Sequence, residues 1–392
     1  MFSRFVSQDH GSVVLSNLDR LTWARLVSNA SYRFAPPFVA VIARGLDVSV
    51  AELGVALMFA EFAGLLSPVI GRRIDRVNRR SAMAFGMSGV ALAAGGAAVS
   101  TGPVSLTVAL FVLSASKVVF DTSLIVWVND HVPYERRGEV VGVIETSWAL
   151  GLFVGVSAMG IVTAAAGWRW GFVLGSVAMV VSGLNLVRGL PRDDAHAPAP
   201  TGEKPRIPAA GWLVIAGFFT LLGAAQAVGI VFGPWFEDDF GFGSAGIVAV
   251  VIAMGLVELV GSVGASRLMD RWGKEASMLR GTAVMVVACL GMVGARDVAW
   301  LAVPLVVLFF LGFEFGIVCL LPVAANIVPA AGGVGLGTAV GAGTCGRAVM
   351  SSVATGLYDS SGAAAAAVLA TALSLAAGLL VMRYRSVSGS RS

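Results

Sequence analysis

The sequence predicts an all-α membrane protein with twelve transmembrane helices in two pseudo-symmetric six-helix halves. Three observations predict this class. Of the 392 residues, 57% are hydrophobic and only 13% are charged, whereas an average soluble domain carries about 25% charged residues. The hydrophobic residues gather into stretches of about 20 residues, the length that spans a bilayer. Short sequences that follow these stretches recur about half a chain length apart.

This composition excludes a soluble globular enzyme and a disordered chain, because even a large soluble domain leaves much of its surface in water. The net charge of +4 and the pI near 9.2 are typical of basic cytoplasmic loops in a membrane protein. They therefore do not indicate a nucleic-acid-binding face. Residues 1–20 are polar and lack the apolar run of a cleavable signal, so we interpret them as a cytoplasmic tail.

The N-terminal six-helix half is predicted over residues 21–189 and the C-terminal half over residues 210–383. The predicted spans are 21–43, 52–71, 81–100, 105–128, 140–163, 171–189, 210–232, 246–267, 278–295, 299–323, 334–357 and 362–382. Residues 190–209 are rich in proline and charge, which is typical of a linker. Residues 384–392 form the predicted C-terminal tail.

The basic residues predict the orientation. Of the 27 Lys and Arg residues, most fall on the side that holds both termini and the linker, and only Arg44, Arg169 and Arg296 fall on the opposite side. Loops rich in Lys and Arg stay in the cytoplasm. We therefore expect a multi-pass protein of the cytoplasmic (inner) membrane with both termini in the cytoplasm.

Two loop sequences indicate an internal duplication. The decapeptide GRRIDRVNRR, residues 71–80, follows span 2, and SRLMDRWGK, residues 266–274, follows span 8. A Val-Pro pair follows span 4 at 132–133 and span 10 at 328–329. Two pairs of anchors with nearly the same offset are typical of a repeated unit.

These sequences resemble the major facilitator superfamily. Residues 71–80 resemble its loop signature G-x-x-x-D-R-x-G-R-R, with Asn78 in the second glycine position, and residues 130–138 and 167–172 resemble the end of span 4 and the turn between spans 5 and 6. The resemblance covers residues 21–383 and implies the major facilitator fold and transport by alternating access. Within the superfamily the chain resembles the drug/proton antiporters, whose span-5 glycine pattern residues 151–160 meet in part.

Charged side chains inside the spans are the candidate substrate and proton-coupling residues. A charge in the middle of a bilayer costs at least about 2.5–3.5 kcal/mol, so it needs a partner or water. The cores of spans 3, 6, 9 and 12 carry none, and the resemblance implies that these four helices face lipid. The candidates, including one mid-span tryptophan, are Arg33, Glu61, Lys117, Asp121, Glu145, Trp148, Glu258, Glu314 and Arg347.

Lys117 and Asp121 lie four residues apart on span 4, so we expect them to pair, and Glu145 on span 5 to approach Asp121. Two carboxylates that share one lysine in a low dielectric do not both ionise easily. The hypothesis is therefore that Asp121 or Glu145 takes up a proton during transport. The alternative is a static buried ion pair.

The remaining charges suggest pairs between helices. Glu61 is expected to meet Arg33, and Glu258 to meet Arg347, either as helix–helix contacts, the favoured alternative, or as binding groups. Trp148 lies away from the interfacial positions usual for tryptophan. It is expected either to stack on an amphipathic ligand or to pack in the core.

The charged loop after span 2 is a second candidate site. In the superfamily that the sequence resembles, the matching loop Asp and Arg and a span-4 Asp form a latch that steadies one facing of the carrier. The residues that match this latch, with its copy in the second half, are Gly71, Asp75, Arg76, Arg79, Arg80, Asp130, Asp270 and Arg271. The alternative is that the basic groups only orient the chain.

The chemistry-bearing residues do not indicate an enzyme. The three histidines are scattered in tails and loops, and the G-x-G-x-x-G match at 341–346 lies inside an apolar stretch with no strand before it. We expect no cofactor, no metal and no nucleic-acid partner. The expected partners are a small-molecule substrate, protons as coupling ion and the lipid bilayer, with the protein acting as a monomer.

The spans are rich in phenylalanine and poor in amides, which favours proton-coupled efflux of a small amphipathic compound. The alternative is proton-coupled uptake or exchange of an organic anion or other small metabolite, bound by Arg33, Lys117 and Arg347. A membrane-embedded enzyme or a sensor that transports nothing is less favoured.

Overall fold

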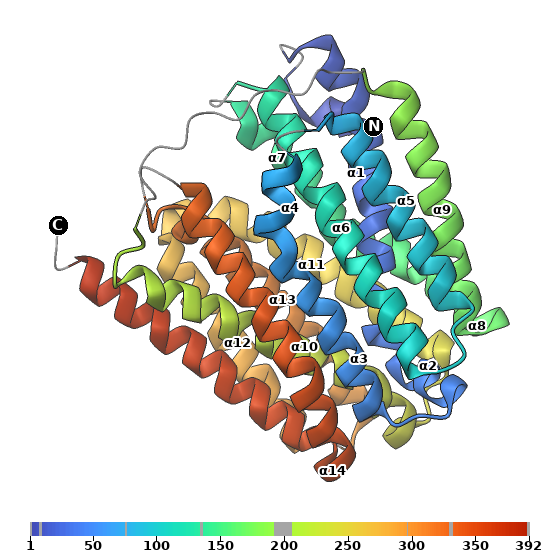
Figure 1. The fold of residues 1–392 in the computed structure, drawn as a ribbon. Helices are drawn as coiled ribbons and strands as arrows, with labels where there is room; N and C mark the ends of the chain where they lie inside the picture. The colour runs from blue at the N-terminus through green and yellow to red at the C-terminus, as the bar shows by residue number, and fades with distance from the viewer. Residues whose placement is uncertain are drawn as a thin grey trace. The chain divides into compact units, whose positions relative to one another are not determined.

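The computed structural model describes residues 2–7, 10–74, 77–133, 136–191, 206–295, 297–328 and 332–389. Its elements are all helical, which confirms the all-α prediction for this part of the chain (Figure 1). By their internal contacts the residues form two compact units. The first holds Met1–Ala35 with Ala63–Pro200, and the second holds Pro36–Phe62 with Thr201–Ser392.

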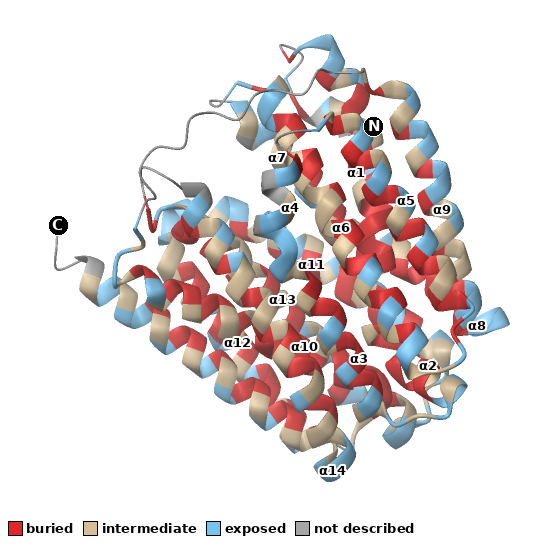
Figure 2. Ribbon diagram, viewed as in Figure 1, coloured by how far each residue is buried: buried red, intermediate tan, exposed pale blue. Residues whose placement is uncertain are grey.

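The first unit is a helical bundle around one apolar core. Its elements are η1 (Phe2–Phe5), α1 (Ser12–Arg33), η3 (Ala63–Leu66), α4 (Ser67–Ile74), α5 (Arg79–Ala98), α6 (Pro103–His131), α7 (Arg137–Leu150), the π-helical turn η5 (Gly151–Val156), α8 (Ser157–Ala166) and α9 (Trp168–Gly189). Met83, Phe120 and Trp127 are fully buried in this core. Figure 2 shows buried residues, in red, along α5 and α6. The core extends along α1, which packs against α7 and α9.

The second unit contains the longest helices. Its elements are η2 (Pro36–Phe38), α2 (Val39–Leu46), α3 (Val50–Phe62), α10 (Gly211–Phe240), α11 (Ser244–Trp272), α12 (Lys274–Gly294), α13 (Ala299–Ala325) and α14 (Gly332–Gly389). α14 packs along α10, α12 and α3, and α13 packs against α11 and α12. The backbone of Gly362 has a φ of 74°, which is not helical, so α14 is divided into two helices at this residue. Glycine permits this break, because few other residues adopt a positive φ without strain.

Within the described residues, nine helices are long and apolar enough to cross a membrane. The bend at Gly362 divides the last of them where the sequence predicted a boundary between two spans. The spans predicted at 21–43 and 52–71 are not continuous helices, because η2 and η3 interrupt them. Pro36 and Pro37 explain the first break, since proline lacks the N–H that a helix interior needs. The count of twelve spans stays a prediction.

The segment from η2 to α3 packs with the second unit although it lies in the first half of the sequence. Gly54 on α3 approaches α14 so closely that a Cβ there would lie 1.9 Å from Oγ1 of Thr355. The backbone N–H of Ala51 donates to Oδ2 of Asp359 at 2.9 Å. The predicted halves, 21–189 and 210–383, follow the sequence repeat, whereas the compact units follow these contacts between helices.

The N-terminal residues predicted as a tail are partly built into the first unit. Helix α1 begins at Ser12, and the side chain of Val6 joins the apolar core. His10 Nε2 lies 2.9 Å from Oε2 of Glu139 on α7. The predicted linker 190–209 falls mostly in residues 192–205, outside the described residues.

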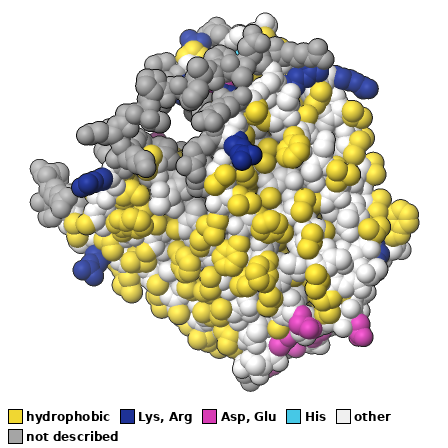
Figure 3. Space-filling model, in the orientation of Figure 1, with side chains coloured by type: hydrophobic (Ala, Val, Ile, Leu, Met, Phe, Trp, Pro, Cys, Tyr) yellow, Lys and Arg dark blue, Asp and Glu magenta, His cyan; other side chains and the backbone are white. Residues whose placement is uncertain are grey.

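The outer surfaces are apolar, as lipid contact requires. Hydrophobic side chains cover much of the face seen in Figure 3. All four helices expected to face lipid expose large apolar side chains, among them Leu92 on α5, Val181 on α9, Val287 on α12 and Leu379 on α14, which are 60–77% exposed. In water such surface would be costly, so these helices suit the hydrocarbon of a bilayer.

Candidate functional site

Four charged side chains from α1, α6 and α7 meet inside the first unit, and we call them the Arg25 cluster. Nη1 of Arg25 lies 2.8 Å from Oε1 of Glu145, and its Nε lies 3.6 Å from Oδ1 of Asp121. The ammonium group of Lys117 pairs with the other oxygen of Asp121. The side chains of Arg25 and Lys117 are 11% and 9% exposed, whereas that of Glu145 is 49% exposed.

The cluster confirms one sequence prediction and corrects another. Lys117 and Asp121 pair as their spacing predicted. The two carboxylates do not share a single lysine, however, because Arg25 supplies a second cation that contacts both. The sequence analysis did not include Arg25 among the candidate residues, although Arg25 lies inside the span predicted at 21–43. With two cations for two carboxylates, the cluster is electrically balanced when all four groups are ionised.

Polar contacts join α1 to α7 at three successive turns of α1. Beyond Arg25 and Glu145, Nδ2 of Asn29 donates to Oγ of Ser147 at 3.2 Å. One turn further along α1, Nη1 of Arg33 donates to the carbonyl oxygen of Trp148 at 3.0 Å. The residue numbers rise together on both helices, so the helices run parallel. Gly151 permits this approach, because a Cβ there would lie 2.9 Å from Cβ of Asn29.

Two aromatic rings border the cluster and face cations. The guanidinium carbon of Arg33 lies 4.5 Å from the ring centroid of Trp148, and Nζ of Lys117 lies 5.4 Å from that of Tyr32. Both distances are within the range of cation–π attraction. The structure therefore brings five of the predicted site residues together in the first unit: Arg33, Lys117, Asp121, Glu145 and Trp148.

Glu61 and Arg347 form a bidentate ion pair in the second unit. Nη2 of Arg347 lies 2.9 Å from Oε1 of Glu61, and Nε lies 3.3 Å from Oε2. Their side chains are 7% and 16% exposed, so the pair joins α3 to α14 inside the unit. Sequence reasoning had assigned Arg347 to Glu258 and Glu61 to Arg33, and it did not foresee this partner. Both of those assigned pairs stay predictions.

Two further carboxylates lie buried between α11 and α13. Glu258 is fully buried, and Glu314 is 5% exposed and accepts a hydrogen bond from Oγ of Ser262 at 2.6 Å. Ser262 follows Glu258 by one helical turn, so the three oxygen-bearing groups are neighbours in this unit. Within the part of the chain that the structure describes, no three His, Cys, Asp or Glu side chains gather as a metal site would require.

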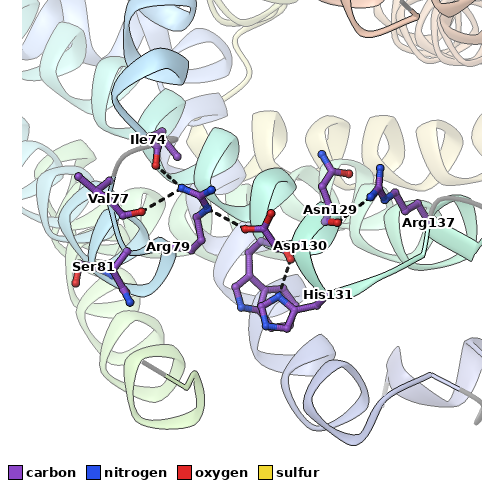
Figure 4. A network of polar contacts seen from close by, with 10 residues as sticks. Ile74, Val77, Arg79, Ser81, Asn129, Asp130, His131 and Arg137 are labelled. Atoms are coloured by element: carbon purple, nitrogen blue, oxygen red, sulfur yellow. Dashed lines mark hydrogen bonds and ion pairs between the residues drawn. The ribbon is translucent and has the colours of Figure 1, made fainter. Parts of the chain in front are cut away.

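Among the described residues, two latch candidates, Arg79 and Asp130, form an ion pair (Figure 4). Nε of Arg79 lies 2.9 Å from Oδ2 of Asp130, and its Nη1 donates to the carbonyl oxygens of Ile74 and Val77. Asn78, in the signature's glycine position, caps α5 by accepting the N–H of Ser81 at 3.1 Å. An asparagine side chain here satisfies an otherwise unpaired helix N–H.

The structure describes four of the other latch candidates. Gly71 lies in α4 and Arg80 in the first turn of α5. Asp270 and Arg271 are exposed in the last turn of α11. Asp75 and Arg76 lie outside the described residues.

Replacing Arg79 by lysine is expected to lower the free energy of unfolding by about 2 kcal/mol. Lysine keeps the charge but cannot reach Asp130 and two carbonyl oxygens at once, and hydrogen bonds to charged groups contribute about 1.5–3 kcal/mol. Denaturant titration of the purified protein in detergent measures the effect. Arg80→Lys, one residue on, is the matched control and should change stability by less than about 0.5 kcal/mol. Equal losses for both variants would contradict the assigned contact.

Comparisons with known proteins agree with this architecture. Residues 21–339 match the sequence profile of the Major Facilitator Superfamily. A bacterial homolog of the human lysosomal transporter Spinster, inward-facing and unoccupied, has a similar structure, with a TM-score of 0.70, 13% identity and 96% coverage of both chains. The human organic anion transporter MFSD10 (TETRAN) gives a TM-score of 0.69 at 17% identity, over 93% of this chain and 99% of that one. A comparison with curated protein sequences finds no match.

Proposed function

Since the chain belongs to the Major Facilitator Superfamily and is a membrane transporter of that fold, we propose that it couples proton movement to the efflux of a small amphipathic compound. One observation carries the proposal. Arg25 is a cation, 11% exposed, that two carboxylates from two other helices share, at 2.8 Å and 3.6 Å. Adding one proton to either carboxylate changes the contacts of all three helices.

Glu145 is the carboxylate that takes up the proton in this proposal. Its side chain is 49% exposed, so water can deliver a proton to it, whereas the side chain of Asp121 is only 26% exposed. Asp121 also keeps two cationic partners, Arg25 and Lys117. Protonation of Glu145 removes its ion pair with Arg25 and leaves that guanidinium to Asp121 alone. Proton binding and substrate binding then compete for the same charged groups.

The neighbouring side chains suit an amphipathic substrate. Tyr32 and Trp148 offer aromatic surface next to the cluster, and each already faces a cation. A ligand with an apolar body and one polar or charged group can use both kinds of surface. We propose alternating access about this site, in a drug/proton-antiporter-like carrier that acts as a monomer in the cytoplasmic membrane, with both termini in the cytoplasm.

An organic anion is the second candidate substrate. Arg25 and Lys117 contact the two carboxylates, and protonation of Glu145 would leave these two cations facing one carboxylate charge. An anionic group could bind Arg25 when Glu145 releases it, which would link proton and anion entry. MFSD10, which is described as an organic anion transporter, shares this fold.

Replacing Glu145 by glutamine is expected to abolish the dependence of transport on a pH gradient. The neutral amide binds no proton, so gradient-driven flux should fall about tenfold or more, while exchange of substrate across the membrane continues. Flux in proteoliposomes with and without a pH gradient measures this. Asp121→Asn tests the other carboxylate, and Glu52→Gln, an exposed carboxylate on α3, is the control. If both cluster variants keep the full response to the gradient, the coupling proposal is wrong.

A ligand screen by thermal shift separates the two substrate classes. Arg33→Ala and Lys117→Ala should remove stabilisation by anionic ligands alone if the protein carries organic anions. Loss of neutral and cationic amphipathic ligands as well would favour the efflux proposal.

A further inference from the structure

The first unit contains an apolar pocket of about 200 Å³ between α1, α8 and α9. It is lined by small and aliphatic side chains, among them Val27, Ala30, Gly155 and Ala178, and Trp23 stands at its edge. Among the described residues, no charged side chain lines it. An apolar cavity of about 150 Å³ in another protein binds benzene, so this space suffices for a segment of hydrocarbon.

The π-helical turn η5 and two glycines shape the pocket. A Cβ on Gly155 would lie 2.3 Å from Cβ of Ala30, and one on Gly175 would lie 2.9 Å from Cε of Met159. These glycines let the backbones of α1, η5–α8 and α9 pack closely together at the bottom of the pocket. The small residues Ala158 and Ala178 leave the outer side unfilled.

The pocket is separate from the Arg25 cluster. Trp23, Val27 and Ala30 share one face of α1, because they lie at helical spacing. Arg25 and Asn29 lie more than 100° away around the same helix, where they meet α7. The proposed transport site therefore does not use this pocket.

The pocket opens toward the bilayer. Trp23 is 46% exposed and Val154 is 42% exposed. Val154 lies in a helix that is long and apolar enough to cross a membrane, and Trp23 lies in the span predicted at residues 21–43. An opening in such a surface meets acyl chains. The side chains that line an empty apolar pocket lose dispersion contacts on the empty side. An acyl chain that enters the pocket restores these contacts.

Two basic residues lie beyond the end of the pocket that is nearest the N-terminal half of α1. Arg20 lies on the same face of α1 as Trp23 and Ala30, about 15 Å along the helix from Ala30. Its two described hydrogen bonds both use Nη1, one to Asn17 and one to Ser16. Arg20 packs over Gly189 at the end of α9, where Arg188 is exposed. Trp23, which lines the pocket one turn from Arg20, lies near the start of the span predicted at 21–43, and tryptophan is common at the ends of spans.

We propose that this site binds a phospholipid with an anionic headgroup, one acyl chain filling the pocket and the phosphate lying at Arg20 and Arg188. Acyl chains are alike among common phospholipids, so the two arginines select the headgroup. The predicted orientation places the lipid in the cytoplasmic leaflet, where anionic lipids lie close to basic side chains.

Native mass spectrometry of the purified full-length protein with added lipid tests the proposal. Palmitoyl-oleoyl phosphatidylglycerol should remain bound at about tenfold lower concentration than the phosphatidylcholine with the same chains. Arg20→Gln should reduce this preference about fivefold. Equal retention of the two lipids, or an unchanged preference in Arg20→Gln, would overturn the headgroup assignment.

The pocket is tested by filling it. Ala158→Phe should lower retention of both lipids, because its ring takes the place of the acyl chain and Ala158 is exposed enough to accept it. Val181→Phe, at a 61% exposed position on α9 outside the pocket, is the matched control and should retain lipid as the parent protein does. Should Ala158→Phe fail to fold, Ala178→Leu fills the same space. Pocket-filled variants that bind lipid as the control does would overturn the proposal.

Discussion

Replacing Arg25 by methionine is expected to stop proton-coupled transport and to lower the free energy of unfolding by about 3 kcal/mol. Removing one partner of a buried ion pair costs about 3–5 kcal/mol, because the other charge is left buried. The lower end applies here, since Lys117 still pairs with Asp121 and Glu145 is half exposed. Denaturant titration in detergent and flux in proteoliposomes measure the two effects.

Companion variants separate charge from geometry. Arg25→Lys keeps the charge but loses the planar fork that reaches Asp121 and Glu145 together, so it should recover only part of the stability. Combining Arg25→Met with Glu145→Gln removes the uncompensated carboxylate and should recover stability without recovering proton coupling. Transport by Arg25→Met with the parent's full response to a pH gradient would refute the role assigned to the Arg25 cluster.

Breaking the pair between Glu61 and Arg347 is expected to lower the free energy of unfolding by about 3–5 kcal/mol. The two side chains are 7% and 16% exposed, so either charge alone would remain buried. Arg347→Glu should be worse than Arg347→Ala, because it places two carboxylates together. Exchanging the charges, Glu61→Arg with Arg347→Glu, should restore more than half of the loss. Thermal and denaturant unfolding in detergent provide the measurement.

Asp359→Asn is the matched control for this pair. Asp359 also joins α14 to α3, through the N–H of Ala51, but it is exposed. An exposed charge contributes at most about 1 kcal/mol, so this variant should unfold almost as the parent does. If the exchanged-charge variant is no more stable than Arg347→Glu alone, the ion pair does not hold α3 to α14.

The sequence alone predicted the features that depend on neighbours along one helix. The apolar stretches predicted helices throughout, and the i,i+4 spacing predicted the pair of Lys117 and Asp121. The loop motif predicted a charged cluster that includes Arg79 and Asp130, and these two side chains are in contact. In each case a local pattern, or a motif matched as a whole, carries the information, because a helix fixes which residues share its face.

Only the tertiary structure shows which helices pack together and which of their residues lie opposite one another. Arg25 joins Asp121 to Glu145, Arg347 binds Glu61, and residues 36–62 pack with the second unit. Small residues set these approaches, as at Gly54 and Gly151, where the helix backbones come so close that a Cβ would collide. Hydrophobic periodicity shows that a helix has an apolar face, but the partner of a buried charge depends on the fit between two surfaces far apart in the sequence.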